Sequence, residues 1–201
     1  YNALNNFKVT TKLPVVVSIA DVGASGAYYV ALAADTIFAN PGSLVGSIGV
    51  ILQSLDFTEL AKKIGIQQNT YKSGPYKDIL SSWRKPKYEE KKMLNNMVKN
   101  VHQQFVNALI KERQFTKKQA KNIANGSLYS GEQAQTNGLI DELGGFEDAI
   151  LYTAKKAGIK GTPLLITRPK GPFQGWLQLI NSQFNALLHQ FFAQSLIPNL
   201  K

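Results

Sequence analysis

The sequence contains no cysteine and only two histidines. The absence of cysteine excludes disulfide bonds, thiolate zinc sites and thiol nucleophiles, although it leaves the cellular compartment open. His102 and His189 fall in segments with helical patterning, beside neither a glycine-rich turn nor an orienting acid. We therefore expect both to be surface or helix-face residues, which argues against a Ser-His-Asp triad.

Acidic residues are also scarce, since 13 acidic side chains stand against 23 basic ones and leave a net charge of +10. Such a charge would suit nucleic acid, anionic lipid or a solvated surface. The basic residues between 60 and 121 carry no aromatic RNA-binding signature, so we expect no nucleic-acid partner. The Asp-Glu-Leu stretch at 141–143 is typical of one exposed turn, and no acidic cluster supports a metal site.

Long hydrophobic runs are missing as well. No window approaches the roughly 20 apolar residues of a membrane-spanning helix, and the N-terminus carries no charged-then-apolar signal segment. The chain begins YNALNNF, without methionine, so we expect a longer biological protein. Its 201 residues, 44% hydrophobic and 18% charged, suffice for the core of one domain or slightly more.

What is present is an alternation of strand and helix patterns. The run PVVVSIA predicts a strand buried on both faces, and SGAYYVALAAD predicts a helix ending near Asp35. This alternation favours an α/β domain with a largely parallel sheet. Further strands are expected at 36–40, in SLVGSIGVIL, in IQQNT and in PLLITRP, and further helices at 2–8, at 57–64, after Pro86, after the N-caps Thr116 and Ser130, and in GGFEDAILYTAKKAG.

Two helical segments, residues 94–110 and 176–192, carry broad apolar faces that need a partner surface. The glycine-rich stretch PGSLVGSIGV lacks both the Gly-Lys-Ser/Thr ending of a phosphate loop and the spacing of a dinucleotide fingerprint. We therefore expect no nucleotide and no other cofactor.

Ser25 lies in the stretch DVGASGAYYVA, where a predicted strand gives way to a helix. A serine on such a turn is exposed, and the neighbouring backbone N–H groups point to where an oxyanion would form. Gly23 and Gly26 would let the backbone turn sharply and let a substrate approach. The local pattern alone nevertheless favours the simpler role of a helix N-cap.

A serine nucleophile without a histidine base needs a lysine whose pKa is lowered from about 10.4 towards 7 or 8. The stretch TYKSGPYKDIL differs from the charged helices because it follows a predicted strand, contains a Gly-Pro turn and continues into Ile79 and Leu80. The chemistry leaves Lys72 and Lys77 both open as this base, and both could equally be solvated loop lysines.

Three stretches in one order, GASGAYYVALAAD, GSIGV and YKSGPYKD, resemble the bacterial signal peptide peptidase A family. These are membrane-anchored serine peptidases with the fold of the Clp protease and crotonase superfamily. The resemblance runs from about residue 13 to 150 and includes the ending YSGEQAQTNGLIDELGG. It implies repeated ββα units with a largely parallel sheet and C-terminal helices.

The resemblance also implies a role for three side chains. Ser25 is the nucleophile, Lys77 is the general base, and Ser47 of the GSIGV stretch orients Lys77 by a hydrogen bond. Lys72 is then the less favoured base. The Ser25 backbone N–H would give one oxyanion donor, and the second would come from a segment outside this chain.

The chain departs from the family pattern at Ala27, where the family usually has glycine, and it lacks both the upstream Gly-Gly stretch and the membrane anchor. We expect residues 1–160 to form the C-terminal part of a Clp/crotonase-like peptidase domain. Residues 161–201 would add a strand and an amphipathic helix.

The resulting hypothesis is a Ser-Lys endopeptidase that cleaves residual signal peptides or other unfolded peptides. By resemblance it would act as a homo-oligomer held in the cell membrane by an anchor outside this chain, with the peptidase domain on the extracytoplasmic side. The alternatives are a crotonase-like acyl-CoA enzyme, a non-catalytic scaffold of the same fold and, more weakly, a basic module that binds anionic lipid.

Overall fold

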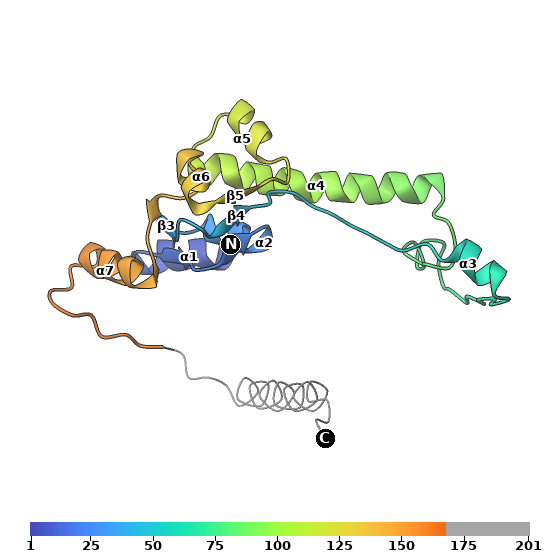
Figure 1. Cartoon of the computed structure of the whole chain (residues 1–201), viewed down its shortest axis with the longest axis horizontal. Helices are drawn as coiled ribbons and strands as arrows, with labels where there is room; N and C mark the ends of the chain where they lie inside the picture. The colour runs from blue at the N-terminus through green and yellow to red at the C-terminus, as the bar shows by residue number, and fades with distance from the viewer. Residues whose placement is uncertain (168–201) are drawn as a thin grey trace, which may run out of the picture. The chain divides into compact units, whose positions relative to one another are not determined.

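The computed structural model describes residues 1–167, of which residues 1–163 form one compact unit and the remainder belongs to a second unit, residues 164–201 (Figure 1). The elements in chain order are α1 (Asn2–Thr11), β1 (Val16–Ile19), β2 (Val22–Ala24), α2 (Gly26–Ala31), β3 (Thr36–Ala39), β4 (Leu44–Gly46), α3 (Thr58–Lys63), α4 (Tyr88–Arg113), α5 (Lys117–Ile123), β5 (Leu128–Ser130), α6 (Gly131–Thr136), β6 (Glu142–Leu143) and α7 (Phe146–Lys156).

The strands form two small sheets, ordered β1-β3-β6 and β2-β4-β5. Both β1 and β6 run parallel to β3, and β2 runs parallel to β4, whereas β4 and β5 are antiparallel. The pairing of Gly23 with Val45 and of Ala24 with Gly46 brings the strand before Ser25 alongside the strand before Ser47. The predicted α/β class with a largely parallel sheet is therefore confirmed.

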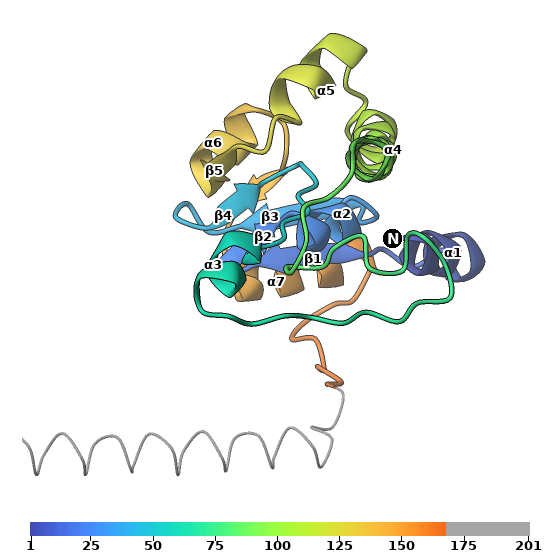
Figure 2. The same cartoon turned by 90° about the vertical axis from the view of Figure 1, so that its right-hand side faces the viewer.

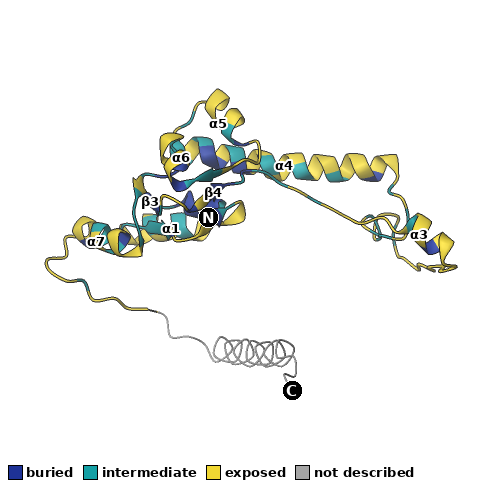
Figure 3. Ribbon diagram, viewed as in Figure 1, coloured by how far each residue is buried: buried dark blue, intermediate teal, exposed yellow. Residues whose placement is uncertain are grey.

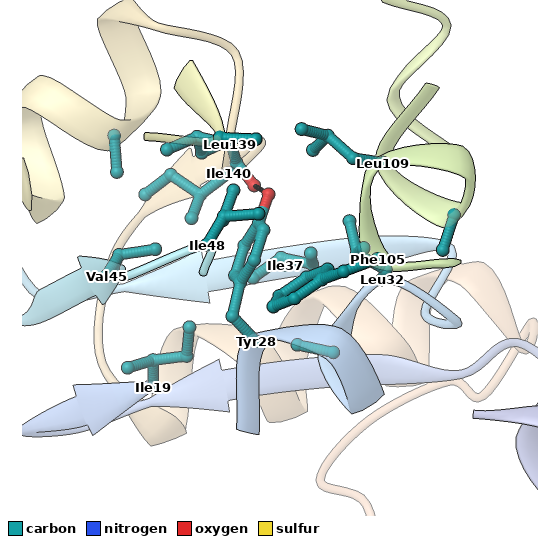
Figure 4. Packing of buried hydrophobic residues seen from close by; sticks show 14 of the residues in the cluster. Ile19, Tyr28, Leu32, Ile37, Val45, Ile48, Phe105, Leu109, Leu139 and Ile140 are labelled. Carbon is teal, nitrogen blue, oxygen red and sulfur yellow. Dashed lines mark hydrogen bonds between the residues drawn. The ribbon is translucent and has the colours of Figure 1, made fainter. Parts of the chain in front are cut away.

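The core lies between these sheets and the C-terminal half of α4 (Figures 2 and 4). Tyr28 is fully buried at its centre, and its hydroxyl donates a hydrogen bond of 2.6 Å to the Leu139 carbonyl. Burial raises the pKa of the Tyr28 hydroxyl well above its usual range, so it stays a neutral donor. This bond fixes α2, and with it Ser25, against a segment more than a hundred residues away.

The shorter helices begin where the sequence predicts. The hydroxyl of Thr116 accepts from the N–H of Gln119, and that of Ser130 accepts from Gln133, each at 3.2 Å. In both caps the N–H of the capping residue donates to Oε1 of the glutamine, which completes a capping box. Both predicted N-caps are confirmed.

Residues 51–87, called the arm below, leave the sheets and return at the N-terminus of α4 (Figure 1). Apart from α3 the arm has neither helix nor strand, so the predicted strand in IQQNT is wrong. All five of its residues are exposed, and no strand of the described chain pairs with them. Figure 3 shows the arm as mostly exposed, and Ala61 is its only buried residue.

Other expectations differ in detail. SLVGSIGVIL gives only the short strand β4, because positive φ angles at Gly46 (97°) and Ser47 (49°) turn the chain out of the sheet. The 141–143 stretch is not an exposed turn: Asp141 pairs with Arg113 at 2.8 Å, and the next two residues form β6. Residues 164–167 form no strand, so PLLITRP is not extended sheet over its described part.

The apolar face of residues 94–110 is only partly buried. Phe105, Ala108 and Leu109 are buried in the core, whereas Met97 and Val101 are about half exposed. The face at 176–192 and His189 lie outside the described residues. Among residues 1–167 no helix has the length and apolarity needed to cross a membrane.

Candidate active site

Ser25 lies between β2 and α2 with a strained backbone. Its φ of 53° and ψ of −124° place a residue with a side chain in a region that usually needs glycine. Although it occupies the N-cap position of α2, its hydroxyl makes no capping hydrogen bond. The N-cap role that the local pattern favours is therefore wrong: the turn presents an exposed serine hydroxyl that the helix does not use.

Close packing and backbone hydrogen bonds build this turn. At Gly23 an added Cβ would lie only 2.5 Å from Cδ1 of Ile19, so a larger residue would have to displace that side chain. The N–H of Ser25 donates to the Gly46 carbonyl at 2.8 Å, and the next residue, Ser47, donates its own N–H to the Ser127 carbonyl at 2.7 Å. The predicted neighbours Ser25 and Ser47 are thereby brought to one place.

The bond from Ser25 to Gly46 changes the expected oxyanion site. The Ser25 N–H, expected as an oxyanion donor, is already bonded to a carbonyl oxygen. The adjacent N–H of Gly26, at the first position of α2, has no hydrogen-bond acceptor within residues 1–167. In this structure Gly26 is therefore the open donor beside the Ser25 hydroxyl.

Ser25 opens onto two cavities that share the segment Gly49–Ile51. The apolar cavity, of about 350 Å³, lies between this segment and α4 and is lined by Ser25, Gly26, Tyr29, Gly49, Val50, Ile51, Val101, Gln104 and Phe105. The polar cavity, of about 390 Å³, is lined by Ser25, Ser47, Gly49, Val50, Ile51, Val98, Lys99, His102, Ala124, Asn125 and Gly126. A peptide placed over Ser25 would find a pocket for a side chain on one side and polar groups on the other.

His102 is closer to this site than the sequence indicates. It is half-buried on α4 and lines the polar cavity together with Ser25, Ser47 and Gly126. Its Nε2 lies 2.9 Å from the Ala124 carbonyl, so that nitrogen carries the proton and is not free as a base. The expectation that His102 lies on a helix face is confirmed. The end of α5 packs against α4, however, and brings His102 to the cavity at Ser25, a proximity that no local sequence signal indicates.

Lys77 does not join this site within the described chain. It follows α3 in the arm, is exposed and lines neither cavity at Ser25. Helix α3 itself lies beyond the N-terminus of α4 (Figures 1 and 3). From Val98, which lines the polar cavity, back to Tyr88 the helix alone covers about 15 Å at 1.5 Å per residue. One chain therefore presents its predicted nucleophile and its predicted base at separate places.

The two candidate lysines differ in their partners. Lys72 pairs with Asp78 at 2.6 Å and donates to the Pro75 carbonyl at 3.3 Å, so its ammonium is held by the arm itself. Lys77 has no ion pair within residues 1–167, and its N–H closes a turn onto Gly74 at 3.3 Å. Of the two, Lys77 is the lysine whose amine is available.

Ala27, the departure from the family pattern, is exposed in the first turn of α2. An alanine fits this helical position better than glycine does, because it costs less backbone entropy. We therefore expect its methyl group not to obstruct Ser25.

Comparisons with known proteins identify the family of this chain. The model of Peptidase family S49 matches residues 8–160. An Enterococcus faecium protein provisionally named signal peptide peptidase SppA is 39% identical over 138 residues, which are 69% of this chain and 40% of that protein. The chloroplastic serine protease SPPA of Arabidopsis thaliana is 34% identical over 78% of this chain and 24% of its own length.

Protease 4 of Salmonella typhi is 33% identical over 73% of this chain and 24% of its own length. The chain thus spans less than half the length of these relatives. A solved structure of an enoyl-CoA hydratase/isomerase family protein from Hyphomonas neptunium matches with a TM-score of 0.40 and 19% identity, over 78% of this chain and 41% of that one. At that TM-score the likeness supports no further conclusion.

Proposed function

Because this chain belongs to the S49 family of peptidases, we propose that it carries the nucleophile and the general base of a serine endopeptidase. Ser25 is the nucleophile and Lys77 is the base. The observation that carries the proposal is the turn at Ser25, which holds an exposed hydroxyl at a positive φ, unused by the helix and open to two cavities. Backbone strain of this kind is typical of functional sites.

The chemistry follows from these groups. A neutral Lys77 amine takes the proton of the Ser25 hydroxyl while Oγ attacks the peptide carbonyl carbon, and the resulting oxyanion accepts the Gly26 N–H. The protonated amine then gives its proton to the leaving amine, so that an acyl-enzyme and a free peptide amine form. Water, deprotonated by the same lysine, hydrolyses the acyl-enzyme and restores Ser25.

The dyad forms between two copies in this proposal. Each chain has an unfilled site at Ser25 and an exposed arm that carries Lys77 elsewhere, so the arm of one copy fills the site of the next. Such a head-to-tail contact closes into a ring when the rotation between successive copies adds up to a full turn. It also covers the arm's large exposed side chains and favours a neutral amine by removing Lys77 from water. These side chains are Ile51, Leu55, Phe57, Leu60, Ile64, Ile66, Tyr71, Tyr76, Leu80 and Trp83.

The substrates proposed are residual signal peptides or other unfolded peptides. An extended peptide would lie along the irregular segment Gly49–Ile51 and place an apolar side chain against Val101 and Phe105. Signal peptides supply such side chains. The assembly would be held in the cell membrane by a segment outside this chain, with the site on the extracytoplasmic side.

The test uses the complete protein and a fluorophosphonate serine reagent, with a quenched apolar peptide as substrate. We expect the reagent to label Ser25 and to stop peptide hydrolysis, and Ser25→Ala to abolish both. Ser54→Ala, at an exposed serine of the arm, is the matched control and should behave as wild type. Labelling of the Ser25→Ala protein at the wild-type rate, or acyl-CoA turnover without peptide cleavage, would refute the proposal.

A further inference from the structure

The most densely paired ionic cluster of the described residues lies in the arm, at the residue next to Lys77. Arg84 donates to both carboxylate oxygens of Asp78, from Nε at 2.8 Å and from Nη2 at 2.9 Å. Its Nη2 also donates to the Asp78 carbonyl at 3.1 Å. Three bonds from one guanidinium thus hold both the side chain and the backbone of the residue that follows Lys77.

The same guanidinium reaches the long helix. Arg84 donates from Nη1 and Nη2 to the two carboxylate oxygens of Glu90, at 2.8 and 2.6 Å. Glu90 lies in the first turn of α4, is only 1% exposed, and also accepts the Lys87 N–H at 2.7 Å. Arg84 therefore joins the Lys77 turn to the start of α4.

Helix α4 connects this turn to the core of its own chain. It runs for 26 residues, and Phe105, Ala108 and Leu109 on it are buried in that core. The arm has one buried residue, so apolar packing does little to fix the Lys77 turn. The paired fork of a guanidinium fixes orientation as well as distance, which an ammonium cannot do.

Charge explains why this cluster holds together. Hydrogen bonds from Arg84, and then from Lys72, hold the pKa of the Asp78 carboxyl well below its usual range. Those from Arg84 and from the Lys87 N–H lower the pKa of Glu90 to about 2. Both carboxylates are therefore charged at neutral pH, and Asp78 forms ion pairs with Arg84 and Lys72 rather than with Lys77.

From these contacts we infer that Arg84 is a positioning residue for Lys77, acting through Asp78 and Glu90 to fix the lysine turn against α4. The inference rests on the proposed role of Lys77 as the base. Arg84 lines neither cavity at Ser25 of its own chain, and its guanidinium donates to Asp78 and Glu90, so we expect it to position the lysine turn rather than to bind the peptide. Its loss should therefore affect the transition state, in which the proton moves, and leave the bound ground state unchanged.

The experiment compares Arg84→Met, Arg84→Lys and Lys85→Met in the complete protein, with kcat and KM determined per mole of assembled enzyme. We expect Arg84→Met to lower kcat by about 10- to 100-fold, as a displaced catalytic group does, with KM within about twofold of wild type. Arg84→Lys should recover part of kcat. Lys85→Met should change neither value, since Lys85 is exposed and makes one long ion pair, 3.6 Å from Glu59.

Asp78→Asn and Glu90→Gln keep the size of each side chain. They test the positioning role of Arg84 if Arg84→Met fails to fold. Each should lower kcat by less than Arg84→Met and leave KM unchanged. Wild-type kcat in a folded Arg84→Met protein, or in both isosteric variants, would overturn the positioning role, as would a rise in KM that accounts for the whole loss. If Lys77→Ala retains full activity, the proposed base is wrong; if Lys77→Ala is inactive and Arg84→Met is fully active, only the positioning role fails.

Discussion

The serine region and the arm are built in opposite ways. Around Ser25, paired strands, a fully buried Tyr28 and the packed half of α4 hold the turn from several directions. The arm has one buried residue, no strand, and an ionic cluster in place of a core. Under the proposed function this contrast is expected, because a nucleophile needs a rigid turn within its own chain, whereas a base delivered to a neighbouring copy needs a surface that a second copy can cover.

The sharpest test of this difference compares the two lysines of the arm. Lys77→Ala should lower kcat for peptide hydrolysis on the order of 10⁴-fold, as loss of a member of a catalytic unit does. Lys72→Ala removes one ion pair to Asp78, which Arg84 still holds, and should cost less than about fivefold. Steady-state kinetics on the complete protein separate the two. Equal losses of kcat in Lys77→Ala and Lys72→Ala would contradict the assignment of Lys77, rather than Lys72, as the base.

A second comparison truncates one aromatic ring in each region. Phe105 is 5% exposed and packs edge-on against Tyr29 with ring centroids 4.9 Å apart, so Phe105→Ala should lower the free energy of unfolding by about 3 kcal/mol or more. Trp83 is 42% exposed, and Trp83→Ala should cost less than about 1 kcal/mol.

Urea denaturation followed by circular dichroism measures both values, and light scattering should show that Trp83→Ala weakens assembly instead. If Trp83→Ala lowered the free energy of unfolding as much as Phe105→Ala does, the contrast between the two regions would be contradicted.

The ionic cluster of the arm should make stability depend on acid. The pKa of Glu90 in the folded protein is about 2, below its ordinary value of 4.5, so its contribution is complete above pH 4.5 and is lost as the pH falls to about 2. The stability gap between wild type and Glu90→Gln should therefore be widest at neutral pH and close over that interval.

Urea titrations at pH 7, 4 and 2 would follow the gap, with Glu89→Gln, at an exposed position of the same helix turn, as the control. A gap that is constant with pH would show that the pair with Arg84 does not stabilise the charged carboxylate.

The smallest effect is expected at Ala27. Because its methyl group is exposed, Ala27→Gly should leave kcat/KM within about twofold and lower the free energy of unfolding by about 0.5 to 1 kcal/mol, the usual cost of glycine in a helix. A peptide assay and a thermal melt suffice. A tenfold gain in kcat/KM would mean that the methyl group does obstruct the site.

Local sequence patterns predicted much of the serine region and little of the arm. The β-branched run before Ser25, the glycine at 23 and the caps at Thr116 and Ser130 act within a few residues, so their signals are legible in the sequence. The place of His102 at the cavity that Ser47 also lines depends on the end of α5 packing against α4, which no short stretch encodes. Likewise, the strand predicted in IQQNT has suitable residues at its ends but no neighbouring strand with which to pair.

The sequence also did not indicate which backbone N–H groups near Ser25 are hydrogen-bonded and which are open. That Ser25 bonds to Gly46, and that Gly26 is the open donor, follows from the register of β2 on β4 and from the positive φ at Ser25. Residue identities alone do not fix either. The resemblance to a family implied that Ser25 and Lys77 are partners, but only the structure shows that Lys77 lines neither cavity at Ser25 of its own chain.

Complementation between two inactive variants tests the central claim most directly. Ser25→Ala retains a Lys77 arm and Lys77→Ala retains a Ser25 site, so unfolding them together in equal amounts and refolding should produce mixed assemblies. If the dyad forms between copies in a head-to-tail ring, random mixing should restore about a quarter of the wild-type peptidase activity. No recovery in assemblies shown by mass spectrometry to contain both variants would contradict the account.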